Sequence, residues 1–345
     1  MRTRASAALV VLLAGCSLPY VAHVSYGQAR ILIGRISIES RLEDPSVSEA
    51  EKAKLRLVLE VKKYAKEEIG LAASSSYESV YDTEGDPVAW NLSACDDDAF
   101  LPYTWDFPIM GVMPYKGYFY REPAVEEARE IKAAHKDVLL APVSAYSTLG
   151  WFADPVYTPM IAYRDEELAN VVFHELTHAT IFIERDSEFN ETLATFVGNQ
   201  GAVDFFLAKG GKDDPRLASA ARAASDDRVF QAQISALRAK LDAVYKANLS
   251  REEKLREKAK IFGDFKNDFA TKVAPTLETD HYAFVATHEL NNAWILALAR
   301  YHGDLEVFAK VHAKLGSRLR ATVEKLKEIA RSDDPRKALT DFVKD

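Results

Sequence analysis

The feature that most constrains this chain is a pair of histidines set in an apolar segment. Residues 171–179 read Val-Val-Phe-His-Glu-Leu-Thr-His-Ala, which contains the pattern H-E-x-x-H. Residues four apart lie about 40° apart around an α-helix, so His174 and His178 would project from one helix face. Two imidazoles placed in this way can hold one Zn²⁺, and Glu175 beside them can reach a metal-bound water as general base.

The segment around this motif is expected to be a helix from Asp165 to Ile183. Acidic residues in its first turn suit the positive end of the helix dipole. Apolar residues recur through it at helical spacing: Leu168, Val171, Val172, Leu176, Ala179 and Ile183. A helix this apolar would bury both histidines, and a metal ion explains why it carries them. A second helix is expected from about Glu188 to Ala208.

A zinc site of this kind needs three protein ligands and keeps a fourth position for water. Five acidic residues that follow the motif are candidates: Glu184, Asp186, Glu188, Glu191 and Asp204. Glu184 falls about 240° around the helix from His178, on the wrong face. Asp186 and Glu188 lie in or beside the turn, where helix capping explains them better. Glu191 fits, because an antiparallel helix pair with a short turn would bring it back over the histidines.

The helix that carries Glu191 has small residues on the same face, which allows a close approach to its neighbour. These residues are Ala194, Thr195, Gly198 and Ala202. This stripe supports a shared ion independently of the H-E-x-x-H pattern.

The remaining chain is expected to be mainly helical, with a small antiparallel or mixed sheet before the H-E-x-x-H helix. The helices are expected at Tyr20–Arg41, Ser46–Gly70, Glu122–His135, Asp214–Tyr245, Ser250–Val273, His281–His302 and Asp304–Ile329. The strands are expected at Ser79–Tyr81, Val88–Leu92, Pro108–Met113, Gly117–Tyr120 and Val138–Tyr146, with a hairpin around Pro114–Gly117. The fold class is therefore α+β, predominantly α. Residues 17–165 form a helical and sheet portion, and residues 166–345 form a helical portion that carries the metal site.

Residues 1–16 have the outline of a secretory signal rather than of folded structure. Arg2 and Arg4 precede a short apolar run, and Leu13-Ala14-Gly15-Cys16 ends it. This ending resembles the lipobox of bacterial lipoproteins, in which the cysteine is lipidated and becomes the mature N-terminus. An ordinary signal peptide or a short buried segment is the alternative, and the run is too short to span a bilayer. Lipidated Cys16 would hold an exported protein at a membrane surface, and Ser17 favours the periplasmic side of the outer membrane in a Gram-negative host.

Charge and cysteine content limit the kinds of partner and the covalent cross-links that the chain can have. The formal net charge is −8, and no sustained basic block follows the first residues, which argues against nucleic acid. The only other cysteine is Cys95, so lipidation of Cys16 leaves no intramolecular disulfide. The aspartates that follow Cys95 are best explained as a solvated turn. No obligate protein partner is evident.

The H-E-x-x-H helix followed by Asn190-Glu191 on the next helix is similar to gluzincin metallopeptidases of the thermolysin and aminopeptidase type. More closely, the chain resembles a bacterial lipoprotein family named "putative aminopeptidases". The stretches that carry this resemblance are the lipobox, residues 105–111, 115–119, 147–155, 173–178 and 189–191, and Leu290-Asn291-Asn292-Ala293. The resemblance implies a zincin-like core, one Zn²⁺ per chain on His174, His178 and Glu191, Glu175 as base, and peptide substrates. Thr195 departs from the thermolysin pattern, in which an aspartate often orients a histidine from this position.

The group that stabilises the oxyanion is less determined. If His281–His302 is helical, His281, His288 and Asn292 share a stripe, whereas Tyr301 lies about 180° from Asn292. Each of the four has an ordinary structural explanation as a surface or core histidine, a capping asparagine or a packing tyrosine. Residues 146–151 could pair with an extended peptide as an edge strand.

Two other functions stay open on the sequence. One is a zinc endopeptidase, because no acidic residue that would hold a free α-amine is identifiable, and the aminopeptidase expectation rests on the family name. The other is a non-catalytic zinc lipoprotein that acts as a chaperone or scaffold in the envelope. A purely structural zinc site would not need Glu175 and would have no open position.

Overall fold

The computed structural model describes residues 18–72, 75–107, 111–145, 148, 152–184, 186–301 and 305–344. The signal segment predicted over residues 1–16 and the predicted lipidation site Cys16 lie outside these described residues. The α-helices are α2 (Leu18–Gly34), α3 (Ile38–Glu43), α4 (Glu49–Tyr64), α5 (Arg121–Ala133), α6 (Thr158–Ile161), α7 (Asp165–His178), α8 (Ser187–Gly210), α9 (Pro215–Lys246), α10 (Arg251–Asp268), α11 (Asn292–Tyr301), α12 (Leu305–Lys314), α13 (Leu319–Ala330) and α14 (Pro335–Lys344). Single turns of π-helix extend α4 and α10, over Ala65–Ile69 and Phe269–Val273.

The strands are short and form three small sheets, so the fold is α+β and predominantly α, as predicted. They are β1 (Ile36–Ser37), β2 (Ser79–Tyr81), β3 (Ala89–Asp96), β4 (Trp105–Phe107), β5 (Gly111–Met113), β6 (Tyr115–Tyr118), β7 (Lys136–Val143) and β8 (Val156–Tyr157). The strand orders are β1-β2-β8, β6-β3-β7 and β4-β5. Only the β2–β8 pair is parallel among these described strands.

The hairpin predicted around Pro114–Gly117 is wrong. Strand β5 pairs back onto β4, with Trp105 opposite Met113, so the chain reverses before β5 rather than after it. Strand β6 instead pairs with β3, where Trp90 lies opposite Tyr118. The turn signal of Pro114 and Gly117 is local, whereas the choice of partner strand depends on which faces are buried.

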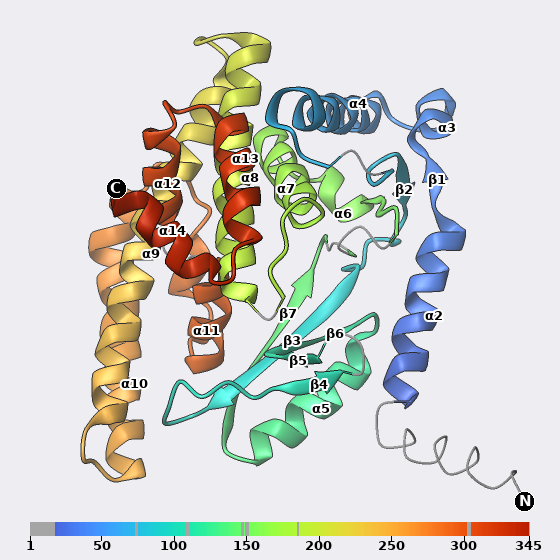
Figure 1. Cartoon of the computed structure of the whole chain (residues 1–345). Helices are drawn as coiled ribbons and strands as arrows, with labels where there is room; N and C mark the ends of the chain where they lie inside the picture. Colours follow the sequence, from blue (N-terminus) through green and yellow to red (C-terminus); the bar gives the residue numbers. More distant parts are fainter. Residues whose placement is uncertain are drawn as a thin grey trace, which may run out of the picture.

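The long β3–β7 pair separates two of the cores. Leu92 and Leu140 lie opposite each other and belong to the core under α5. Leu139, the residue before Leu140, packs against the core of helices α9 to α11. Alternation along a strand sends adjacent side chains to opposite faces, so one sheet contacts two helical layers. Figure 1 shows α5 below this sheet and α11 to its left.

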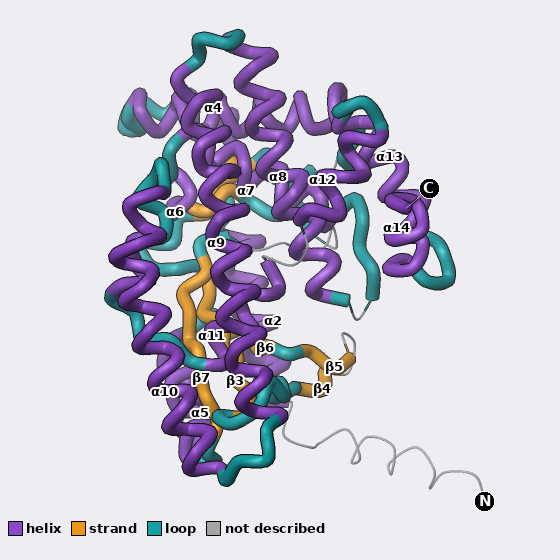
Figure 2. Tube along the Cα trace, turned by 90° about the vertical axis from the view of Figure 1, so that its left-hand side faces the viewer, coloured by secondary structure: helices purple, strands orange, loops and turns teal. Residues whose placement is uncertain are grey.

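The largest core takes residues from both ends of the chain and surrounds α7 and α8. It includes Ile31 from α2, Val58 from α4, Phe173 from α7 and Leu326 from α13. In Figure 2 strands β3 to β7 lie below the packed helices α4, α7, α8 and α12, with α9 and α10 along one side. Within the described part of the chain, no helix is both long enough and apolar enough to cross a bilayer.

The helix predicted to run to Ile183 ends at His178. Asn190 on α8 accepts a hydrogen bond from the Ile183 N–H at 2.9 Å and donates one to the Ile183 carbonyl at 2.8 Å. The hydroxyl of Thr180 donates to the Leu176 carbonyl at 2.6 Å. These side chains satisfy backbone groups that a longer helix would use itself, so the chain leaves the helix immediately after the second histidine.

The helix predicted over His281–His302 is also wrong in its first half. The segment contains a 3-10 turn at Ala283–Ala286, and α11 begins only at Asn292. The Asn291 side chain accepts from the Trp294 N–H at 2.9 Å, and the Asp137 carboxylate accepts from the Asn292 N–H at 2.7 Å. These two caps fix the start of α11, which sequence periodicity does not register.

Three other predicted helices are interrupted or shortened. The first ends at Gly34, because Ile36 pairs with Val80 in a strand before α3 begins. The last splits into α12 and α13 around Gly316 and Ser317, which both have left-handed backbone conformations. The helix predicted from Ser46 begins at Glu49, with Ser48 as its N-cap and Gly70 in a left-handed conformation after the last turn.

Candidate metal centre

The close packing of α7 on α8 positions the candidate site. A Cβ on Gly198 would lie 2.8 Å from Asn170 Oδ1 and 3.0 Å from the Asn170 carbonyl oxygen, and a Cβ on Gly201 would lie 2.9 Å from the Phe173 ring. Asp186 caps α8 by accepting from the Phe189 N–H at 3.1 Å, so the second helix starts immediately after the turn. The small-faced helix pair predicted from the sequence is therefore present.

Three side chains from these two helices converge at the centre of the pair. The Nε2 atoms of His174 and His178 are 3.1 Å apart. Glu191 Oε2 lies 3.2 Å from Nε2 of His174 and 3.4 Å from Nε2 of His178. Among the described residues, these three form the one group of His, Cys, Asp or Glu side chains whose donor atoms could hold a metal ion together.

These separations fit a zinc ion. Zn–N and Zn–O bonds of about 2.0–2.1 Å at the tetrahedral angle place two ligand atoms about 3.3 Å apart. The observed distances of 3.1, 3.2 and 3.4 Å lie around this value. The donor set of two imidazoles and one carboxylate is the set of catalytic zinc sites that keep an open position for water.

The charges of the site suit a cation. Burial acts to raise the pKa of Glu191, but hydrogen bonding to His174 and His178 outweighs it and leaves the pKa well below its ordinary value. Burial acts to lower the pKa of His178, and the Glu191 carboxylate reverses this and raises it. Glu191 is therefore held as a carboxylate between the two imidazoles. The Nδ1 atom of His178 is buried and has no hydrogen-bond partner in the described part of the chain.

Glu175 lies beside this cluster with different electrostatics. Burial raises the pKa of its carboxyl group above the ordinary value, and the negative charges of Glu191 and Asp154 act in the same direction, against the two histidines. Two carboxylates of one site thus have pKa values shifted in opposite directions. Such a split is typical of sites in which one carboxylate binds and the other exchanges a proton.

Two residues near Glu175 were not predicted as part of the site. Tyr77 is buried, and its pKa is raised well above the ordinary value by burial and by the charges of Glu175 and Asp154. Its backbone N–H donates to the Asp154 carbonyl at 2.6 Å. The Asp154 carboxylate in turn accepts from the Thr148 N–H at 2.9 Å and from its hydroxyl at 2.8 Å.

These contacts connect the segments before β2 and β8, and the charge of Asp154 acts on Glu175 of the H-E-x-x-H helix. The stretch 147–155 resembles a family segment, and this is the one signal that could have pointed to Asp154. The φ of 62° at Tyr77 has no sequence signal, because only the fold requires a left-handed tyrosine.

The three oxyanion candidates whose side chains the structure describes do not gather at one site. His281 and His288 are exposed, and His288 Nδ1 lies 3.0 Å from the carbonyl oxygen of Phe284 in its own segment. Tyr301 ends α11, and its side chain is outside the described part of the structure. The predicted stripe of His281, His288 and Asn292 is wrong, because no helix connects them.

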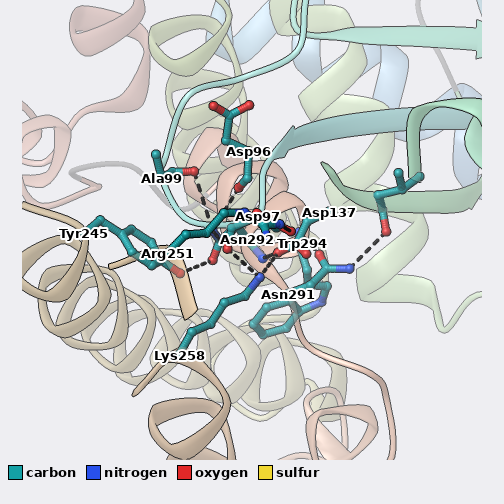
Figure 3. A network of polar contacts seen from close by, with 11 residues as sticks. Asp96, Asp97, Ala99, Asp137, Tyr245, Arg251, Lys258, Asn291, Asn292 and Trp294 are labelled. Carbon is teal, nitrogen blue, oxygen red and sulfur yellow. Dashed lines mark hydrogen bonds and ion pairs between the residues drawn. The ribbon is translucent and has the colours of Figure 1, made fainter. Parts of the chain in front are cut away.

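Asn292 has a structural role, which Figure 3 shows. It is fully buried, its Oδ1 accepts from the Tyr245 hydroxyl at 2.7 Å, and its Nδ2 donates to the Asp96 carbonyl at 3.0 Å. Beside it, Lys258 Nζ forms an ion pair with Asp137 at 2.5 Å. These contacts connect α9, α10 and α11 to the ends of β3 and β7.

The edge strand predicted at residues 146–151 falls almost entirely outside the described residues. Strand β7 ends at Val143, and of those six positions the structure describes Thr148 alone. The pairing of that stretch with a substrate stays a prediction.

Comparison with known proteins gives one family. No curated protein matches the chain, and no solved structure matches it. The family described as "Putative aminopeptidase" matches residues 19–339, from the start of α2 to α14. This match covers nearly the whole chain, and with the metal-binding geometry already described we conclude that the chain belongs to the family of "Putative aminopeptidase" proteins.

Proposed function

We propose that this protein is a zinc-dependent peptidase, with His174, His178 and Glu191 as metal ligands and Glu175 as general base. The observation that carries the proposal is the convergence of three donor atoms at 3.1–3.4 Å next to a second carboxyl group, that of Glu175, whose pKa is raised. One zinc ion per chain would polarise the scissile carbonyl and lower the pKa of a bound water.

Charge balance and proton transfer are assigned to side chains of this protein. Glu191 stays ionised and balances the charge of the cation. Glu175, whose pKa is raised, accepts a proton from the attacking water on its carboxylate and delivers it to the nitrogen of the leaving amine. The nearby Asp154 carboxylate acts in the same direction as burial and favours the protonated form of Glu175.

The central experiment compares Glu175→Gln with Glu191→Gln in the full chain. Zinc content is measured by elemental analysis, and hydrolysis is measured on a library of unblocked peptides. We expect Glu175→Gln to keep one zinc per chain and to turn over substrate at least about 100-fold more slowly, because it removes the base but no ligand. Wild-type protein that binds one zinc and cleaves nothing in the library would favour the non-catalytic scaffold.

The preference for a free N-terminus rests on the family description. Acetylation of the substrate N-terminus tests it directly, because an aminopeptidase must recognise the α-amine. We expect acetylated peptides to resist cleavage. Equal rates on acetylated and free peptides would make the protein an endopeptidase with the same metal site.

We further propose that the protein is an exported lipoprotein, anchored to a membrane surface through Cys16. The support is the order of residues 1–16: two arginines, a short apolar run and a small-small-Cys ending. In a Gram-negative host, Ser17 favours the periplasmic side of the outer membrane. Mass spectrometry of the mature N-terminus distinguishes an acylated Cys16 from cleavage elsewhere.

A further inference from the structure

Helix α2 presents an uncharged apolar face to solvent along its whole length. Six of its exposed positions, 21, 22, 25, 26, 29 and 33, fall within an arc of about 140° at 100° per residue, and the other exposed positions, 19, 30 and 34, lie beyond its edge. Side chains on this arc include Val21, Tyr26 and Ile33, which are 40%, 60% and 85% exposed. The only Asp, Glu, Lys or Arg in the helix is Arg30, beyond the edge of the arc, where it donates to the Tyr120 hydroxyl at 2.8 Å.

The opposite face of α2 is fixed to the protein, so the apolar arc cannot rotate inward. The Tyr20 hydroxyl donates to the Gly117 carbonyl at 2.9 Å, and His23 Nε2 accepts from the Phe119 N–H at 3.0 Å. Gly27 lies against the Phe119 ring so closely that an added Cβ would be 2.0 Å from it. Figure 1 shows α2 along one side of the molecule, where its outer face has no neighbouring element.

This face is unlike that of the other surface helices. Helix α10 has Arg251, Glu252, Arg256, Glu257, Lys260 and Asp264 at exposed positions. Exposed apolar residues are ordinary when they are scattered, but a continuous uncharged stripe on one helix marks a surface that is covered.

The position of this helix in the chain identifies what covers it. Leu18, its first residue, lies two residues after the predicted lipidation site Cys16. An acyl chain at Cys16 would hold the start of α2 at a bilayer surface, and this tether raises the effective concentration of the helix there. An apolar helix face beside such an anchor would add a second contact with the same surface.

We propose that α2 lies flat on the lipid surface, with Val21, Tyr26, Ala29 and Ile33 inserted at the level of the headgroups. The inference rests on the lipid-anchor part of the proposed function and is independent of the zinc chemistry. At 1.5 Å per residue, the 17-residue helix extends about 25 Å along the membrane. Because its face lacks lysine and arginine, its contact with lipid is apolar and does not depend on salt.

The experiment uses the full-length acylated protein, reconstituted into vesicles of phosphatidylethanolamine and phosphatidylglycerol. Ala29→Cys places a single labelling site on the apolar arc, and Ala259→Cys is the matched control on an exposed position of α10. Cys95 is fully buried, so an environment-sensitive fluorophore labels the introduced cysteine alone. Both substitutions are small and exposed, and folding is checked by circular dichroism and thermal unfolding of each variant.

For the label at position 29, we expect a blue-shifted emission and quenching by nitroxide-bearing lipids several-fold stronger than at position 259. High salt should leave this difference unchanged. The proposal is overturned if aqueous iodide quenches both labels equally in acylated, vesicle-bound protein. It is also overturned if the position-29 label is protected without vesicles in a concentration-dependent way, because a second copy of the chain then covers the face.

The outcomes separate this inference from the rest of the proposed function. An acylated, peptide-cleaving protein with an accessible position 29 contradicts only the lipid contact of α2. Absence of acylation at Cys16 in mass spectra removes the tether and overturns the lipid contact with it, whatever the peptidase assay gives.

Discussion

Glu191 shows how the surroundings of a residue turn an ordinary carboxylate into a candidate metal ligand. It lies between two imidazole nitrogens at 3.2 and 3.4 Å, and its pKa is held low despite its burial. Glu188, one turn earlier on the same helix, is exposed and has no contact with the histidines among the described residues. The difference lies in where α8 points the two side chains rather than in their chemistry.

We expect Glu191→Gln to reduce zinc affinity by at least about 100-fold, because the substitution removes the negative ligand. Competition with a chromogenic chelator measures the affinity. Glu188→Gln is the matched control and should leave it unchanged. Retention of zinc by Glu191→Gln at wild-type affinity would exclude Glu191 as a ligand.

The single described cysteine should be chemically inert in the folded protein. Cys95 is fully buried, and burial together with the charge of Asp137 raises the pKa of its thiol well above the ordinary value. Because the thiolate is the reactive form, we expect no reaction with a disulfide reagent at pH 8 and one full equivalent of reaction in denaturant. Rapid labelling under native conditions would show that the end of β3 opens.

At the scale of elements, the metal centre depends on how closely α7 and α8 approach. Gly198 and Gly201 give the contact surface its shape, because side chains at these positions would overlap Asn170 and Phe173. Helix propensity opposes glycine inside a helix by about 1 kcal/mol relative to alanine. The two glycines therefore lower the intrinsic stability of α8 but allow the close packing that the site requires.

Gly198→Ala is expected to destabilise the protein by about 1–3 kcal/mol, because the new methyl group would contact backbone as well as side chain. It should also weaken zinc binding by moving Glu191 away from the histidines. Gly263→Ala in α10 is the control: an added Cβ there meets nothing within 4 Å, and we expect stabilisation of about 0.5–1 kcal/mol. Urea unfolding of both variants measures the difference, and equal effects would mean that the helix contact is not tight.

The N-terminus of α8 should make stability depend on pH. Burial acts to raise the pKa of Asp186, but hydrogen bonds from Arg336 at 2.6 Å outweigh it, so the folded-state pKa lies below the ordinary value. The ionised group therefore stabilises the fold above about pH 4, and this contribution is lost as pH falls through the lower folded-state pKa.

Asp186→Asn keeps the helix cap but removes the charge that pairs with Arg336. We expect it to cost about 1 kcal/mol at pH 7 and to reduce the loss of stability on acidification. Chemical unfolding of both proteins between pH 3 and pH 7 provides the measurement. Parallel stability curves over this range would assign the acid sensitivity to other groups.

At the scale of the whole molecule, three cores have to be connected around one site. The main core encloses α7 and α8, the second lies among α9, α10 and α11, and the third lies under α5. The network around Asn292 and Lys258 connects the second core to β3 and β7 (Figure 3). The Asn292 side chain thus serves assembly of the molecule and makes no contact with the described metal ligands.

Asn292→Ala should destabilise the protein by about 2–4 kcal/mol, because the Tyr245 hydroxyl and buried carbonyl oxygens lose their partner. The zinc affinity of the folded fraction should be unchanged.

His281→Ala and His288→Ala alter exposed side chains and should change neither stability nor turnover beyond the error of measurement. A large loss of turnover in either histidine variant, with zinc content intact, would return that residue to the active site.

The local features of the sequence were sufficient for part of this structure. The helix with His174 and His178 on one face follows from the 3.6-residue period, and Ser48 caps α4 as its spacing to Glu51 predicts. Glu191 was reachable too, because a short turn between two helices leaves few positions that can return to the first. Each of these inferences involves residues that are close in the chain.

Contacts between residues that are far apart in the sequence determine the remaining features of the structure. Strand β6 pairs with β3 instead of β5. Helix α7 ends at His178, and the Asn190 side chain accepts a hydrogen bond from the backbone N–H of Ile183 beyond its end. Asp154 and Tyr77 come together near Glu175 from two segments that are far apart in the sequence. The free energy of these choices comes from buried hydrogen bonds and packing between distant residues, which exist only once the chain has folded. The sequence therefore specifies the candidate metal-binding motif, whereas Asp154, whose charge acts on Glu175, is brought to it by the tertiary structure.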